Sequence, residues 1–207
     1  MKQNHILLVV IDAQRAFVDP AGSLARAFGF DEVRPAVTAL SRLRAFLTER
    51  SSDARIVLVR SEYHPGQFTG GQLDHPLADL CVPSRNIDCE WAEGLDTSRA
   101  SAIVTKHHAN ATEAAAYREV IDQAIGNGAR QIVFVGFQFT TCVRASALTT
   151  LDLVGSRGVR VAVAEGLTGS RTSSYRPTRD GLSRVEFTRR ELQESGVAVV
   201  GEFDEAV

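Results

Sequence analysis

Six short apolar runs punctuate this chain, and most are continuous and rich in valine and isoleucine instead of alternating with polar residues. They lie at residues 6–11, 56–59, 102–105, 132–135, 159–164 and 197–200. Continuous runs of this kind are typical of strands buried on both faces, as in a parallel sheet that is covered by helices. The runs therefore predict a sheet of about six mostly parallel strands.

Helical patterns lie between the runs. Apolar residues recur at a spacing near 3.6 in four segments: 33–47, 117–125 with Thr112 as a cap, 142–153, and 178–194. Pro35 falls early enough to be tolerated in the first turn of its helix. Strands that alternate with helices predict an α/β fold, a three-layer αβα arrangement with a Rossmann-like open sheet. We find no internal repeat or linker, and expect residues 1–207 to form a single domain.

Residues 62–99 are the exception to this alternation. The segment holds several prolines, Cys81, Cys89, the only tryptophan (Trp91) and two histidines. A connection this long in a compact domain is usually a lid, a binding loop or a subunit contact. Because it follows the second strand, we expect it to form a wall at the carboxyl edge of the sheet, where open α/β sheets bind ligands.

Composition excludes several classes of protein. The formal charge of −2 gives no overall basic footprint for nucleic acid, and no apolar run is long enough to span a membrane. Residues 157–190 contain eight arginines and three acidic residues, and we interpret this local positive charge as side chains on solvated faces of loops and helices. The start of the chain does not resemble a signal peptide, and three cysteines do not make a disulfide framework. We therefore expect a cytoplasmic protein with no nucleic-acid or membrane partner.

Three chemically distinct side chains follow three of the predicted strands. Asp12, Lys106 and Cys142 each stand near the carboxyl end of a strand, so a parallel sheet brings them to one edge. A cysteine at a helix start beside a lysine favours the thiolate, and a carboxylate can take the thiol proton and later deliver it to a leaving amine. Each residue alone is more often structural, but together they predict a cysteine hydrolase that acts through a thioester.

The same segments resemble the isochorismatase-like cysteine hydrolase superfamily, which includes nicotinamidases, N-carbamoylsarcosine amidases, ureidoacrylate amidohydrolases and isochorismatases. The resemblance rests on Asp12-Ala13-Gln14-Arg15-Ala16-Phe17, on Val104-Thr105-Lys106, and on the block from Gly136 to Ala147 with its glycine six residues before Cys142. It extends over nearly the whole chain.

The resemblance implies roles for individual residues. Asp12 is similar to the family's general base, Lys106 to its activating lysine and Cys142 to its nucleophile. It also implies a cis peptide bond between Phe137 and Gln138, which would turn the Gln138 N–H towards the oxyanion beside that of Cys142. Because the cysteine is present, the resemblance favours hydrolysis of an amide or related C–N bond, without a cofactor.

One branch of the family binds a metal ion after the second strand, and this chain departs from that pattern. Glu62 and His64 keep the spacing, but Phe68 stands about where a further histidine is expected. Since a firm site needs three or four ligands, we expect no metal. A zinc site formed by Cys81 and Cys89 is disfavoured by their spacing. A metal-assisted nicotinamidase-type amidase remains an alternative, as does a non-catalytic binding or scaffold protein with this architecture.

Further residues are candidates for binding a small-molecule substrate because they lie near the predicted strand ends. They are Gln14, Phe17, Arg60, Glu62, Tyr63, His107 and Arg171. Phe17 is expected to be a wall of the pocket, and Arg171 is the residue best placed to bind an acidic substrate. The resemblance also suggests a homo-oligomer.

Overall fold

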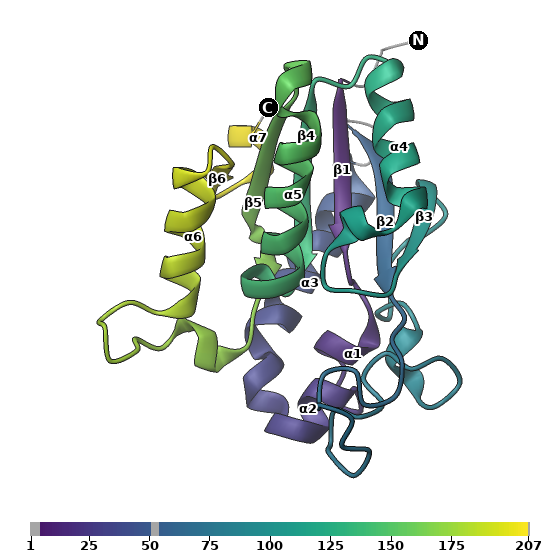
Figure 1. The fold of residues 1–207 in the computed structure, drawn as a ribbon, viewed down its shortest axis with the longest axis vertical. Coiled ribbons are helices and arrows are strands. Elements are labelled where there is room, and N and C mark those ends of the chain that lie inside the picture. Colours follow the sequence, from purple (N-terminus) through teal and green to yellow (C-terminus); the bar gives the residue numbers. More distant parts are fainter. Residues whose placement is uncertain (1–4, 51–53, 207) are drawn as a thin grey trace.

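The fold is a six-stranded, all-parallel sheet with helices on both faces, as the sequence predicts (Figure 1). The computed structural model describes residues 5–50 and 54–206. The strand order is β3-β2-β1-β4-β5-β6. The strands are β1 (Ile6–Ile11), β2 (Arg55–Ser61), β3 (Ala100–Lys106), β4 (Gln131–Phe137), β5 (Arg160–Gly169) and β6 (Ala198–Val200).

Two hydrophobic cores lie on opposite faces of the sheet. Along β1, Leu8 and Val10 belong to one core, and Leu7, Val9 and Ile11 to the other. This alternation explains why the strand has no polar position, since both of its faces are buried. Helices α3 (Phe30–Arg50) and α7 (Phe203–Ala206) cover the first face, and α4 (Ala115–Gly126), α5 (Arg144–Val154) and α6 (Arg184–Glu194) cover the second (Figure 1).

Shorter helical segments connect these elements. Helices α1 (Arg15–Val18) and α2 (Ser23–Phe28) follow β1 and lie beyond the carboxyl end of the sheet (Figure 1). Single turns occur at Ile87–Cys89, Ala111–Glu113, Gly155–Arg157 and Thr172–Tyr175, and a π-helical turn, Phe139–Val143, precedes α5. None of the helices in ranges 5–50 and 54–206 has the length and hydropathy needed to cross a bilayer.

Several helix boundaries differ from the expected ones. Helix α6 begins at Arg184 instead of near residue 178, because Ser183 and Glu186 form a capping box at its start. The turn before α4 is capped by Asn110, not Thr112. Pro35 lies inside α3, past its first turn, because that helix already begins at Phe30.

The segment 62–99 contains no α-helix or strand among its residues, and it is held by main-chain contacts to the start of the chain. Gln14 and Trp91 form an antiparallel bridge, and Trp91 is half-buried against the first core. The Asp88 carboxylate is fully buried and accepts hydrogen bonds from the N–H groups of Ser23 (3.0 Å) and Cys81 (3.1 Å). One carboxylate thus joins this segment to α2.

Candidate active site

The strand order reverses between β1 and β4, and the candidate residues lie at the carboxyl ends beside this point. Asp12 directly follows β1, Lys106 ends β3, and Cys142 lies in the π-helical turn after β4. Lys106 Nζ lies 2.9 Å from Asp12 Oδ2, and both side chains are inaccessible to solvent. Two of the three residues thus form a buried ion pair, which joins groups 94 positions apart only through the fold.

Ser61 and Tyr63 complete the surroundings of this pair. Lys106 Nζ donates hydrogen bonds to Ser61 Oγ (2.6 Å) and Tyr63 Oη (3.2 Å), and a third to the carbonyl of His108 (3.1 Å). Ser61 Oγ donates to Asp12 Oδ1 (2.9 Å). The ammonium therefore has a partner for each of its three protons besides the carboxylate charge, as a buried lysine requires.

A close approach between β1 and β4 brings Cys142 towards Asp12. Gly136 has a φ of 102°, and a Cβ atom at this position would lie 2.1 Å from the carbonyl oxygen of Ile11. Only glycine fits this conformation and this spacing. The next peptide bond, Phe137–Gln138, is cis. The chain then enters the turn that carries Cys142.

The Cys142 thiol is buried, and burial raises its pKa to about 11. The charge of Lys106 and a hydrogen bond from Tyr63 lower the pKa, whereas the charge of Asp12 and the hydrogen bond that its carboxylate accepts from the thiol raise it. The sequence argument expected the helix start and Lys106 to favour a thiolate. Burial and the neighbouring carboxylate outweigh them, so the resting thiol is neutral.

The other two groups of the network also carry shifted pKa values. Burial alone would lower the pKa of Lys106, but the charges of Asp12 and Cys142 raise it above its usual value. Burial raises the pKa of Tyr63 above its usual value, and the negative charges of Cys142 and Asp12 add to this. At neutral pH the lysine is therefore charged and the tyrosine keeps its proton.

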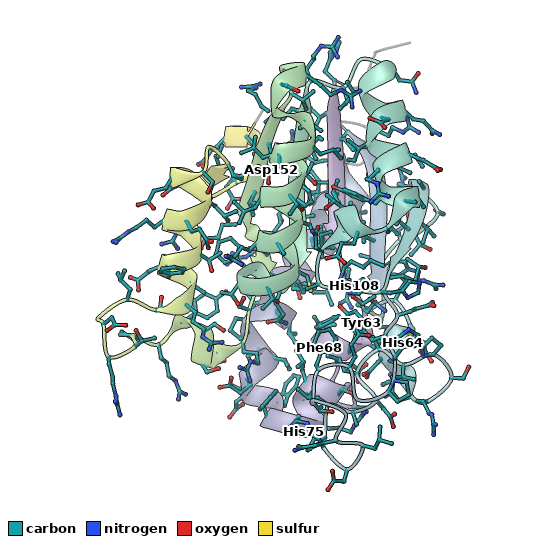
Figure 2. The ribbon with its side chains drawn as sticks, in the orientation of Figure 1. Tyr63, His64, Phe68, His75, His108 and Asp152 are labelled. Atoms are coloured by element: carbon teal, nitrogen blue, oxygen red, sulfur yellow. The ribbon has the colours of Figure 1, made fainter. Side chains whose placement is uncertain are left out.

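A cavity of 290 Å³ opens beside Cys142. Its lining includes the expected residues Phe17, Tyr63, Gln138, Cys142 and Arg171. Tyr63 and Phe68 come from the segment 62–99, and their rings meet edge to face at 4.6 Å (Figure 2). With Leu77 and Leu80, this segment supplies four of the residues that line the cavity.

Four candidate binding residues lie outside the lining of this cavity. Gln14 is fully buried, and its amide exchanges hydrogen bonds with the main chain of Ser61. Arg60 and Glu62 form an ion pair of 2.7 Å. His107 is exposed, and its ring bonds to the carbonyl of Glu62 (2.8 Å). Gln14 thus positions Ser61, and the other three stabilise the strand ends without reaching the cavity.

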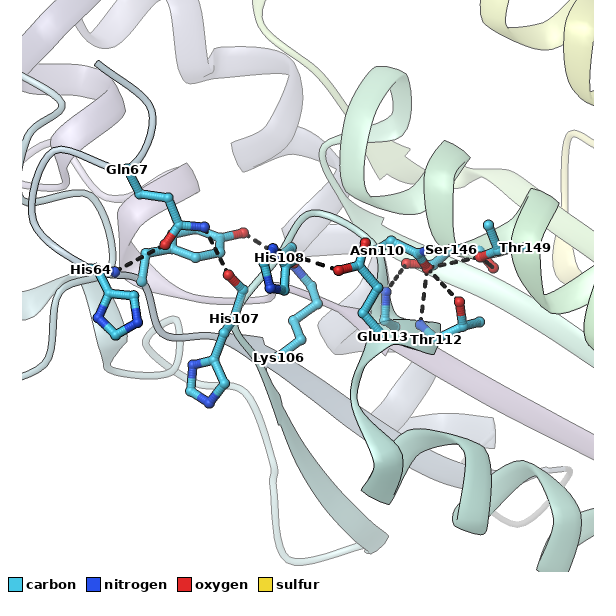
Figure 3. Close-up of polar contacts among 12 residues, drawn as sticks. His64, Gln67, Lys106, His107, His108, Asn110, Thr112, Glu113, Ser146 and Thr149 are labelled. Carbon is cyan, nitrogen blue, oxygen red and sulfur yellow. Dashed lines mark hydrogen bonds and ion pairs between the residues drawn. The ribbon is translucent and has the colours of Figure 1, made fainter. Parts of the chain in front are cut away.

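The loop after Lys106 is tied to α5 by side-chain hydrogen bonds (Figure 3). Asn110 Oδ1 accepts from the main-chain N–H of Thr112 (2.9 Å) and from the hydroxyl of Thr149 (2.8 Å). Ser146 Oγ accepts from the N–H of Ala111 (3.0 Å). These contacts hold the loop whose His108 carbonyl binds Lys106, and they give Thr149 a structural role.

Sequence reasoning did not identify several residues of the site. Ser61, which contacts both members of the ion pair, follows a buried strand and has no distinguishing motif. Leu24, Phe28, Phe68 and Arg184 also line the cavity. The one sequence signal that could have identified Ser61 is its position at the end of β2, where it pairs with Lys106 at the end of β3.

The residues proposed for a metal-assisted alternative do not converge. His64 is exposed, and Glu62 is paired with Arg60. In the part of the chain that the structure describes, no group of three or more His, Cys, Asp and Glu side chains is placed to hold a metal ion. Cys81, Cys89 and Cys142 are all free thiols.

Comparisons with known proteins bear on the family and the fold. A model of the isochorismatase domain matches residues 6–186. Among solved structures, PnC1 from L. infantum in complex with nicotinate superposes with a TM-score of 0.72 at 19% identity, covering 97% of this chain and 94% of that one. A search of curated protein sequences found no match.

Two further solved structures have the same fold. The pyrazinamidase of Pyrococcus horikoshii in complex with zinc gives a TM-score of 0.70 at 19% identity, with 96% of this chain and 99% of that chain covered. The N-carbamoylsarcosine amidase from Thermoplasma acidophilum gives 0.65 at 19% identity, with 94% and 95% covered. At this identity the likeness to these structures shows the fold alone.

Proposed function

Because the chain belongs to the isochorismatase family of hydrolases, we propose that it cleaves a small amide or related C–N bond through a thioester on Cys142. The observation that carries this proposal is the buried Asp12–Lys106 pair, which lies close enough to Cys142 to shift the pKa of its thiol, with Cys142 in the wall of a cavity. Base, cation and nucleophile meet where a carbonyl can bind.

The first half of the reaction forms the thioester. Asp12 takes the thiol proton, and the sulfur attacks the carbonyl carbon to give a tetrahedral intermediate. The protonated Asp12 then gives this proton to the departing nitrogen. The C–N bond breaks, ammonia or an amine leaves, and the acyl group stays on Cys142.

The second half restores the enzyme. Asp12 takes a proton from a water molecule, the water oxygen attacks the thioester, and the C–S bond breaks. The sulfur recovers its proton from Asp12 and the acid product leaves. Between these transfers the positive charge of Lys106 compensates the buried Asp12 carboxylate, 2.9 Å away.

Two hydroxyl groups position the reacting groups in this scheme. Ser61 accepts from Lys106 and donates to Asp12, which fixes the distance between them. Tyr63 Oη accepts from Lys106, and the tyrosine lowers the pKa of the Cys142 thiol, so we assign it the stabilisation of negative charge that develops on the sulfur. The N–H groups of Gln138 and Cys142 are the proposed donors to the oxyanion, and both residues line the cavity.

Ammonia release from small amides, ureas and carbamoyl compounds tests the proposal. We expect Cys142→Ala to lose turnover while keeping its circular dichroism and melting temperature, and Cys89→Ala, outside the cavity lining, to stay active. Mass spectrometry of the quenched wild-type reaction is expected to show the acyl group on Cys142. Hydrolysis that persists in Cys142→Ala would refute the covalent scheme, and activity that depends on a stoichiometric bound metal would favour the metal-assisted alternative.

A further inference from the structure

The lining of the cavity beside Cys142 combines buried polar groups with positively charged ones. Cys142 and Gln138 are only 6% and 7% exposed. Arg171, which is half-buried, and Arg184, which is exposed, belong to the same lining. A molecule with its carbonyl at the sulfur therefore shares the cavity with two guanidinium groups.

Apolar side chains form much of the remaining wall. They come from α1, α2 and the segment 62–99, and comprise Phe17, Leu24, Phe28, Phe68, Leu77 and Leu80. Walls of this composition hold the hydrocarbon part of a ligand, while a few polar groups set its orientation. The volume of 290 Å³ corresponds to a small ligand.

The two arginines lack a carboxylate partner in the part of the chain that the structure describes. Among these residues, neither Arg171 nor Arg184 forms an ion pair, whereas Arg144 on α5 and Arg189 on α6 do. The Arg171 guanidinium stacks over the Phe28 ring at 4.2 Å, which fixes its plane at the cavity. The charge of Glu32 interacts with that of Arg171, but the Glu32 carboxylate accepts its hydrogen bonds from the N–H and hydroxyl of Ser173.

Gln138 provides an independent sign of a ligand. Its side-chain nitrogen is buried and has no hydrogen-bond partner among the residues that the structure describes. An orphaned buried donor is costly, and such groups are rare in folded proteins unless a ligand satisfies them. Since Gln138 lines the cavity four residues before Cys142, a substrate acceptor near the reacting carbonyl completes it.

We propose that the substrate is an acidic amide, with its carboxamide at Cys142 and Gln138, an apolar body between the aromatic and aliphatic walls, and a carboxylate bound by Arg171 and Arg184. This proposal rests on the proposed function for its reacting end. A planar, rigid guanidinium recognises a carboxylate through paired hydrogen bonds, so the two arginines in the lining suit a carboxylate on the ligand.

Binding to Cys142→Ala tests the substrate class without requiring turnover. Two matched pairs of probes, adipic acid monoamide with hexanamide and 4-carbamoylbenzoate with benzamide, are titrated by calorimetry. We expect each acid to bind at least tenfold more tightly than its neutral partner, because a charge-assisted contact to a guanidinium exceeds a neutral one. Arg171→Met and Arg184→Met, each in the Cys142→Ala background, are expected to reduce this preference about tenfold.

Two further variants test the roles of the arginines and of Gln138 separately. Arg179→Met removes an exposed arginine of the same connection that lies outside the cavity lining, and it is expected to keep the preference for the acid. Gln138→Leu keeps the size of the side chain but removes its donor, and is expected to weaken the acid and its neutral partner by the same factor. If Gln138→Leu weakened binding of the acid alone, Gln138 would contact the carboxylate instead of the carboxamide, and its assigned position would be wrong.

The proposal is overturned if neither acid binds, if the neutral amides bind as tightly as the acids, or if Arg179→Met erases the preference as well as Arg171→Met. Hydrolysis by the wild-type enzyme is measured separately. Tight, arginine-dependent binding of the acids without ammonia release would leave the acidic ligand class intact and refute the hydrolytic scheme instead.

Discussion

Asp12 and Lys106 are charged groups that the protein removes completely from water. Removing one partner of such a pair leaves the other uncompensated, which costs roughly 3–5 kcal/mol. We expect Asp12→Asn to lower kcat at least 100-fold with a smaller change in KM, because proton transfer belongs to the chemical steps. Urea denaturation is expected to show the loss of stability.

The double variant Asp12→Asn/Lys106→Met provides the control for that prediction. It removes both charges, so it is expected to recover part of the free energy of unfolding but none of the activity. If Asp12→Asn alone changed only KM, Asp12 would be a substrate-binding residue.

The buried Cys142 thiol gives a second prediction at this scale. Its pKa of about 11 means that its alkylation by iodoacetamide speeds up as pH rises towards 11, with no plateau near pH 7. Mass spectrometry of the modified peptide over pH 6–10 measures the rate, with Cys142→Ala as the background. A plateau below pH 8 would show a thiolate in the resting enzyme and contradict the structure.

The same shift has a consequence for stability. The unfolded thiol ionises near its ordinary value of 9.0, whereas the folded one keeps its proton until about pH 11. The folded state therefore binds more protons between these values, so its stability is present below pH 9 and is lost as pH rises towards 11. We expect Cys142→Ala to show a smaller loss over this range in urea denaturation.

At the scale of elements, the contact between β1 and β4 depends on Gly136. An alanine there has to adopt a φ of 102° with its Cβ inside the contact distance of the Ile11 carbonyl. Backbone strain and overpacking together cost roughly 2–6 kcal/mol. We expect Gly136→Ala to unfold at a much lower urea concentration.

Gly155→Ala is the matched control. Gly155 has a helical φ of −56°, and its nearest neighbour for a new Cβ is a Leu151 side-chain atom at 3.9 Å. It is expected to unfold at the same urea concentration as the wild type or a higher one. Equal stability of the two alanine variants would contradict the proposed close approach of the strands.

Helix α3 and the connection after β5 are linked through a proline. Pro35 has no N–H to donate to the carbonyl of Asp31, and the Thr172 hydroxyl donates to this carbonyl instead (2.5 Å). We expect Thr172→Val to lose about 1 kcal/mol of stability. In a Pro35→Ala background the N–H of Ala at position 35 can donate to the Asp31 carbonyl, so Thr172→Val is expected to lower the free energy of unfolding by less. An equal loss of stability in both backgrounds would contradict this link.

At the scale of the whole molecule, the homo-oligomer suggested by the family resemblance stays a prediction. Ile103 on the edge strand β3 is 52% exposed and Phe187 on α6 is 59% exposed, and burial of such side chains favours association. Light scattering of the purified protein is expected to give a mass above the 22.4 kDa of one chain. A mass of one chain at micromolar concentration would contradict it.

Much of the architecture could be predicted from local sequence patterns. Each apolar run forms a strand. A continuous run of valine and isoleucine needs burial on both of its faces, and a strand between the two cores provides it. Helices α1 and α2 were not predicted. The start of α2 is stabilised by Asp88, 65 residues further along the chain, and no local pattern reveals such a partner.

The sequence by itself determined the parallel sheet and the edge at which Asp12, Lys106 and Cys142 stand, because strand periodicity and the positions of strand ends are local properties. The tertiary structure decided which neighbours surround them. Ser61 and Tyr63 enter the network, Gln14 turns away to hold Ser61, and burial makes the resting thiol neutral. Hydrogen-bond partners and burial depend on segments distant along the chain, so only the packed molecule defines them.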